Sequence, residues 1–185
     1  MKLSISGKIL ATDTQAVAVV GSREMSLRGQ KLTRRFVKEL VQNGYTIVSG
    51  LARGVDTLAH QTALENHGRT IAVLGSGLDI IYPPENKTLA GEIVKNGALV
   101  SPFPRGTKPY PKNFLARNRL IAQLSLAVLV IEGKRRSGTL STASWAANAG
   151  IEVFAVPGSE ATDWLINQGA AIAKRPSDII KYLRP

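Results

Sequence analysis

Two hydrophobic patterns alternate along the chain: short continuous apolar runs, and segments with a helical period. Between the first two runs, Leu32, Phe36 and Leu40 recur every four residues, and Asn43-Gly44 supplies a helix stop. Strands that alternate with helices predict an α/β fold with a parallel sheet and right-handed crossovers. The runs are rich in valine and isoleucine and read as strands buried on both faces: AVAVVG (16–21), YTIVSG (45–50), RTIAVLG (69–75), ALVS (98–101), LAVLVIE (126–132) and EVFAVPG (152–158).

The length of 185 residues fits one core, so we expect a single domain. We assign residues 16–175 to the sheet domain. Residues 1–15 form an N-terminal extension, either a small hairpin or a loose segment. Residues 176–185 form a C-terminal helix or tail, with Ser177 as the expected N-cap.

Basic residues outnumber acidic ones. Lysine and arginine total 24 against 13 acids, a net charge of +11. Such a surplus favours a polyanionic partner, with nucleic acid first, although it also serves solubility alone. The positions of the basic residues favour a polyanionic partner over a role in solubility alone, because many of them lie near the ends of apolar runs, where α/β sheets bind ligands. These residues are Arg23, Arg53, Lys108, Lys112, Arg117, Arg119, Lys134, Arg135 and Arg136.

Composition excludes several other classes. The chain has no cysteine, which rules out disulfides, thiolate metal sites and a cysteine nucleophile. No run reaches 18 apolar residues, and the N-terminal MKLSISGKIL lacks the apolar core of a signal peptide. We therefore expect a cytoplasmic protein with no membrane segment, no metal and no cofactor.

The first candidate site is VVGSRE (19–24), between the first strand and the first long helix. Backbone N–H groups at such a turn carry partial positive charge and accept phosphate, which Arg23 can grip with two hydrogen bonds. The turn, Gly21, Ser22 and Arg23, is not the GxGxxG fingerprint, so dinucleotide binding is unsupported. An ordinary strand-to-helix turn is the alternative.

The second candidate is SGLARGVDTLAH (49–60), where Asp56 and His60 fall on one helical face. His67 lies about 10 Å further along that helix, too far to share a metal ion with His60. A Ser-His-Asp hydrolase is unsupported too, because no GxSxG elbow is present. Asp56 and His60 therefore read as support, with His60 otherwise an ordinary helix histidine. The better interpretation is a phosphate cradle made of Ser49, Gly50, Arg53 and Gly54.

Two later segments add chemistry to the same sheet edge. KRRSGTLSTASW follows the strongest strand and offers Ser137, Gly138 and Thr139 at a helix N-terminus, or else a solvated basic loop with an N-cap. In NFLARNR, Phe114 could stack on a base, although a phenylalanine at this spacing is more often core. Arg117 and Arg119 flank Asn118 and point about 200° apart on a helix, so they cannot both face one ligand. We expect one to bind phosphate and the other to pair internally.

Taken together, the segments resemble the DNA processing protein A (DprA, or Smf) family over residues 16–173. The resemblance is carried by VGSR, IVSGLARGVDTLAH, GRTIAVLGSGLDIIYPPEN, FPRGTKPYPKNFLARNRLIAQLS, VLVIEGKRRSGTLSTA, GIEVFAVPGS and WLINQGA. It implies an extended Rossmann-like, doubly wound, mostly parallel sheet. It also implies a protein that binds single-stranded DNA, protects incoming strands in DNA uptake and recombination, helps load RecA, self-associates as a homodimer and is not an enzyme.

At the positions that match the family motifs, the resemblance implies a binding pocket with a floor and a wall. The floor comprises Gly21, Ser22, Arg23, Ser49, Gly50, Arg53 and Gly54, and the wall Lys108, Arg117, Asn118, Arg119, Ser137, Gly138 and Thr139. The competing interpretation is a nucleotide sensor or a nucleoside-monophosphate hydrolase of the related lysine-decarboxylase-like group. Thr142 stands where the PGGxGTxxE motif of those hydrolases has its glutamate, so the expected acid or base is missing.

Overall fold

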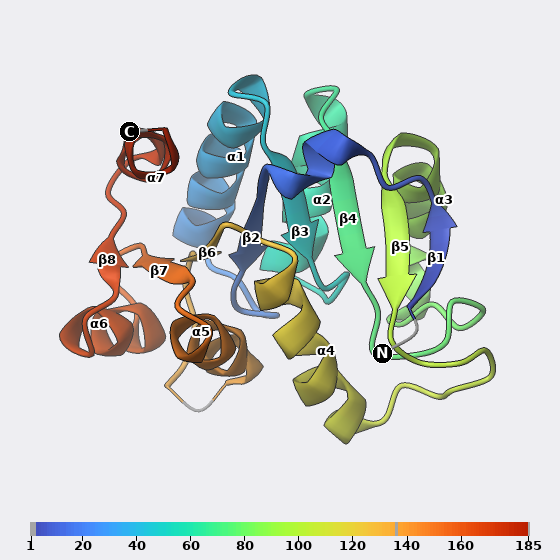
Figure 1. The fold of residues 1–185 in the computed structure, drawn as a ribbon. Coiled ribbons are helices and arrows are strands. Elements are labelled where there is room, and N and C mark those ends of the chain that lie inside the picture. Colours follow the sequence, from blue (N-terminus) through green and yellow to red (C-terminus); the bar gives the residue numbers. More distant parts are fainter. Residues whose placement is uncertain (1–2, 136, 185) are drawn as a thin grey trace.

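An eight-stranded sheet forms the centre of the computed structural model, which describes residues 3–135 and 137–184 (Figure 1). The strand order is β1-β5-β4-β3-β2-β6-β7-β8, and all neighbours are parallel except β1 and β5. The predicted α/β fold and its mostly parallel sheet are confirmed. The strands are β1 (Ser4–Gly7), β2 (Ala16–Val20), β3 (Thr46–Ser49), β4 (Thr70–Val73), β5 (Ala98–Ser101), β6 (Ala127–Val130), β7 (Glu152–Ala155) and β8 (Ala171–Ile172).

Helices cover both faces of this sheet, as a doubly wound fold requires. They are α1 (Leu27–Gln42), α2 (Val55–Glu65), α3 (Lys87–Asn96), α4 (Pro111–Gln123), α5 (Gly138–Asn148), α6 (Glu160–Asn167) and α7 (Pro176–Leu183), with short 3-10 turns η1 (Ala11–Thr14) and η2 (Pro84–Asn86). Alternate strand residues separate the two cores. Val17 and Val19 of β2 face α1, α2 and α7, whereas Ala18 and Val20 face α4, α5 and α6. α3 covers β4 and β5 on the same face as α2.

The N-terminal segment joins the sheet instead of forming a small hairpin. β1 pairs antiparallel with β5, with Ser4 opposite Ser101 and Gly7 opposite Ala98, so its partner lies about a hundred residues away in the chain. The backbone then crosses the amino-terminal edge of the sheet through η1 (Figure 1). The expected extension is therefore an edge strand of the main sheet, with Met1 and Lys2 outside the described residues.

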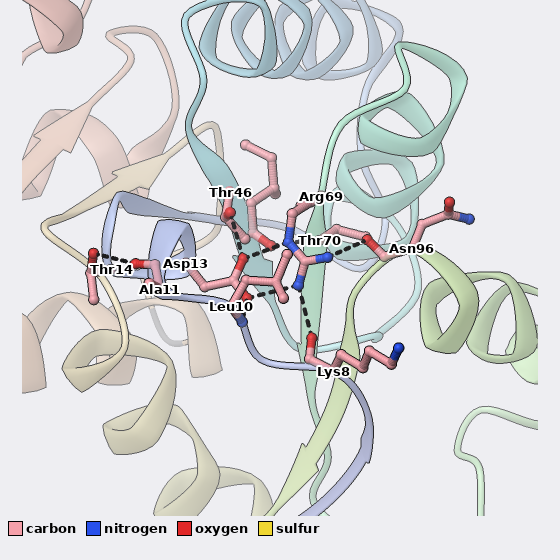
Figure 2. Close-up of polar contacts among 10 residues, drawn as sticks. Lys8, Leu10, Ala11, Asp13, Thr14, Thr46, Arg69, Thr70 and Asn96 are labelled. Atoms are coloured by element: carbon pink, nitrogen blue, oxygen red, sulfur yellow. Dashed lines mark hydrogen bonds and ion pairs between the residues drawn. The ribbon is translucent and has the colours of Figure 1, made fainter.

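A buried carboxylate clamps this crossing segment (Figure 2). The two oxygens of Asp13 accept hydrogen bonds from the Leu10 amide, the Thr46 hydroxyl and the Arg69 guanidinium, each at 2.8 Å. Arg69 also donates to the Lys8 carbonyl. Burial favours the neutral acid, but the hydrogen bonds and the charge of Arg69 outweigh it and lower the pKa of Asp13.

The C-terminal segment is helical up to Leu183. α7 packs Ile179, which is fully buried, into the same core as the inner face of α1. Its N-cap is Arg175 and not the expected Ser177, because Pro176 already occupies the first turn. Pro185 and Arg136 lie outside the described residues. Within the described part of the chain, no helix has the length and apolar character needed to cross a membrane.

Candidate functional site

A pocket of about 530 Å³ opens at the carboxyl edge of the sheet, between the loops that follow β2 and β6. In the sheet, β3 lies on one side of β2 and β6 on the other. The strand order therefore reverses between the neighbouring strands β2 and β6, which makes this position a topological switch point. Open α/β sheets bind their ligands at such points. Residues along α4 and at the start of α5 complete the lining of the pocket.

The loop after β2, Gly21 to Arg23, is held by its neighbours on both sides. The Ser22 amide donates to the Glu132 carbonyl at 3.0 Å, and the Ser22 carbonyl accepts from the Val55 amide at 3.1 Å. A Cβ at Gly21 would lie 2.7 Å from the Val55 side chain, so the loop needs glycine to pass this close. The Arg23 side chain is exposed and lines the pocket.

The N-terminus of α5 faces this loop. Thr139 donates through its hydroxyl to the Gly21 carbonyl at 3.1 Å, and the Asn118 amide donates to the Gly138 carbonyl at 3.1 Å. Ser137, the N-cap residue, holds a buried hydroxyl that has no hydrogen-bond partner among the described residues. The first N–H groups of a helix also lack partners within the helix and carry partial positive charge. This wall therefore offers hydrogen-bond donors to an anion.

Arg117 forms the back of the pocket and is only 3% exposed. It donates to the Val73 carbonyl at 2.6 Å and to the Gly50 carbonyl, and its guanidinium lies 5.7 Å from the Phe114 ring centroid. Burial lowers the pKa of Arg117 to about 10, against the attraction of Asp56, so it stays charged at neutral pH. Arg119 points away from the pocket, as its spacing from Arg117 predicts.

The stretch from Ser49 to His60 is framework more than cradle. Ser49 is fully buried and donates to the Val19 carbonyl at 2.7 Å, and the Gly50 amide donates to Asp56 at 3.1 Å. Burial, opposed by Arg117, raises the pKa of Asp56. These contacts leave the Ser49 hydroxyl and the Gly50 amide unavailable to a phosphate, which corrects the expected cradle at these two positions.

His60 supports the same framework from a fully buried position. Its Nδ1 lies 2.6 Å from the Thr70 hydroxyl, which itself donates to the Ile47 carbonyl at 2.9 Å. Because the hydroxyl proton is already committed, His60 must carry its proton on Nδ1. Burial lowers the pKa of His60 to about 3, so the ring is neutral at physiological pH.

Arg53 and Gly54 lie between this framework and the solvent. Arg53 is exposed, pairs with the Glu85 carboxylate at 2.5 Å, and lines a small cavity adjoining the pocket. Gly54 precedes α2 with a φ of 76°, and a Cβ there would overlap the Ser22 carbonyl. Gly54 thus lets the loops after β2 and β3 touch.

The structure brings together most of the predicted binding residues and separates a few. Lys108 is exposed and does not line the pocket, and Arg119 instead lies 5.3 Å from the Trp145 ring centroid. Gly50 and Arg53 line the adjoining cavity. The predicted residues that line the main pocket are Gly21, Ser22, Arg23, Phe114, Arg117, Asn118, Ser137, Gly138 and Thr139, with Asp56 beside them.

Sequence reasoning missed Tyr82 as a pocket residue. It belongs to the proline-rich YPPEN segment, which interrupts the alternation of strands and helices. In the structure it lines both the pocket and the adjoining cavity. Its position after the predicted strand 69–75 could have indicated that this aromatic side chain lies near the ligand-binding edge of the sheet.

A family model and several relatives assign the chain to one family. The model of the family described as DNA recombination-mediator protein A matches residues 1–184. Protein Smf of Escherichia coli is 45% identical over 98% of this chain and 50% of its own length. The X-ray structure of DNA processing protein A from Streptococcus pneumoniae superposes with a TM-score of 0.92 at 40% identity, covering 97% of this chain and 65% of that one.

A second solved structure concerns the single-stranded DNA binding mode of DNA processing protein A from Helicobacter pylori. It superposes with a TM-score of 0.90 at 33% identity and covers 98% of this chain and 86% of that chain. The chain spans about half the length of the Escherichia coli relative.

Proposed function

Because the chain belongs to the DNA recombination-mediator protein A family, we propose that its pocket binds single-stranded DNA and that the protein acts in DNA processing and recombination. The single observation that carries the proposal is the convergence of two strand-to-helix loops and two arginines at the switch point. The guanidinium groups of Arg23 and Arg117 lie 5.6 and 5.7 Å from the Phe114 ring centroid.

The charge and the donors of the pocket suit a phosphodiester. Arg23 and Lys134 reach it from the solvent side, and Arg117 from the interior. The N-terminus of α5 and the free hydroxyl of Ser137 add neutral donors. Cations and helix N-termini are the groups that proteins use for phosphate oxygens.

The size and the aromatic lining favour an unpaired strand over a duplex. A pocket of about 530 Å³ is in the range that holds a ligand the size of a nucleotide, and Tyr82 and Phe114 line it. Such a pocket admits a nucleotide only if its base is unpaired. Stacking on aromatic rings combined with backbone cations is the usual mode of single-strand binding.

The competing candidate is a mononucleotide sensor or hydrolase of the related superfamily. Thr142, which replaces the glutamate expected of those hydrolases, lines the pocket. We therefore propose a binding protein and not an enzyme. A sensor would still fit the pocket, and ligand length separates the two, because a sensor should prefer a mononucleotide.

We also propose that the protein binds RecA and forms a homodimer with a second copy of this chain. The cytoplasm is its proposed location. Their support is the family relationship alone. Pull-down of RecA by the protein bound to single-stranded DNA tests the first partner. Light scattering at increasing protein concentration tests for the homodimer.

The decisive experiment for the binding function is a length series. Fluorescence anisotropy with oligothymidylates of increasing length, challenged with AMP, should show affinity that rises with length and little competition by the mononucleotide. Tighter binding of AMP than of any oligonucleotide would favour the sensor instead. Equal affinity for duplex DNA of the same length would contradict the preference for single strands.

A further inference from the structure

We propose that the ring of Tyr82 is the platform on which a nucleobase of the bound strand stacks, with Phe114 as its support. The inference deepens the proposed function, on which it rests, by naming the side chain that meets the base. Tyr82 lies between β4 and α3 and borders both the pocket and the adjoining cavity. It is therefore placed where the two spaces meet.

Phe114, the aromatic residue expected from the sequence, is partly buried and already packed against other groups. The guanidinium groups of Arg23 and Arg117 lie 5.6 and 5.7 Å from its ring centroid. A Cβ at Gly75 would lie 2.7 Å from the Phe114 ring, so the backbone there packs closely against it. Arg23, Arg117 and Gly75 leave Phe114 better suited to holding its neighbours than to receiving a base.

Tyr82 offers the more accessible ring. It is 38% exposed, one of the exposed large side chains of the molecule, although it lines a pocket. Its ring centroid lies 5.7 Å from that of Phe114 at an interplanar angle of 50°, an arrangement in which one ring supports the other. An exposed ring held from behind loses little conformational freedom when a base stacks on it.

The phosphate-binding groups lie at a suitable reach from this ring. Arg23 and Tyr82 both contact Phe114, so a cation and an aromatic face share one support. Arg53 lines the same adjoining cavity as Tyr82. A strand whose phosphate meets Arg23 or Arg53 can therefore place the attached base over Tyr82.

Comparison of a normal strand with an abasic strand tests the inference. The probes are an oligothymidylate and an abasic deoxyribose-phosphate strand of the same length. Tyr82→Ala should weaken oligothymidylate binding about fivefold, the low end of stacking by one base, and leave the abasic strand unaffected. Tyr82→Phe should bind as the wild type does. Tyr182→Ala is the matched control, because Tyr182 is 54% exposed on α7 and does not line the pocket.

A fluorescent variant gives a readout that a structural role would not change. In Tyr82→Trp, oligothymidylate should quench emission beyond the background of Trp145 and Trp164, and the abasic strand should not. If Tyr82→Ala binds both strands as the wild type does, or loses the same affinity for both, the inference about Tyr82 is wrong, whereas the proposed binding of single-stranded DNA stands. A wild-type protein that binds neither strand would instead refute the proposed function itself.

Discussion

Replacing Arg117 with methionine tests whether the pocket is held together by a buried charge. The side chain is 3% exposed, and its guanidinium supplies hydrogen bonds to the carbonyls of Gly50 and Val73. Gly50 also donates its amide to Asp56, so a single residue connects the buried cation to the buried carboxylate. Methionine keeps much of the volume and removes the charge and every donor.

The expected loss follows from those contacts. Two carbonyl groups lose a charged donor, at about 1.5–3 kcal/mol each, and Asp56 loses its compensating charge. Better apolar packing by methionine offsets part of this, so we expect Arg117→Met to lower the free energy of unfolding by about 3–5 kcal/mol, the range for breaking a buried pair. A domain with a typical 5–15 kcal/mol of stability would still fold.

Urea unfolding at two pH values measures the loss. The folded pKa of Asp56 is already raised by burial, and Arg117 opposes that rise. Without Arg117 the folded pKa rises further, so the folded state takes up a proton more readily and its stability falls as pH increases. The destabilisation by Arg117→Met should therefore be smaller at pH 5 than at pH 8.

A second substitution separates charge from packing. Asp56→Asn added to Arg117→Met removes the stranded carboxylate, and the double variant should recover at least 1 kcal/mol relative to simple addition of the single losses. A loss below 1 kcal/mol for Arg117→Met, or additive losses with no pH dependence, would show that the buried charge of Arg117 does not hold the pocket together.

Three further predictions concern other residues. Arg23→Ala should weaken single-stranded DNA binding for all sequences and reduce the salt slope by about 0.7 per lost phosphate contact, measured by anisotropy, whereas Arg34→Ala on α1 should not. Asp13→Asn should cost about 1–3 kcal/mol at pH 7 in urea unfolding; because the folded pKa of Asp13 is lowered, that cost should shrink as pH falls below about 4. His60 should show an Nδ1-protonated neutral ring in NMR spectra from pH 8 to 5, since its pKa is about 3, and its contribution should lower stability as pH falls below about 6.5; a ring that titrates near pH 6 would contradict the assignment.

The strands could be predicted because both of their faces are buried. Runs such as AVAVV and AVLV contain no polar position, and in the structure every residue of β2 and β6 is buried. The N-terminal strand could not be predicted in the same way. β1 pairs with a strand about a hundred residues away in the chain. Its alternation of polar and apolar residues, which the structure shows as alternating exposure, is as typical of a hairpin strand as of an edge strand.

The candidate site was predictable in its chemistry and only partly in its geometry. Glycine, hydroxyl and arginine at strand ends indicated an anion site, and Gly21, Arg23 and Thr139 line the pocket. Helical spacing showed that Arg117 and Arg119 diverge, but only the packing of α4 shows that Arg117 faces inward. From its sequence context Ser49 was expected to bind phosphate, yet its hydroxyl donates to the Val19 carbonyl of the neighbouring strand β2.

The position of DNA on the protein is the most direct test of the central claim. A single-stranded oligonucleotide containing 5-iododeoxyuridine can be cross-linked by light to the protein and the attached peptides identified by mass spectrometry. We predict adducts within residues 21–24, 82–83, 109–118 and 137–142, segments that contribute to the pocket and its adjoining cavity. Adducts confined to α7 or to the β1 edge would contradict it.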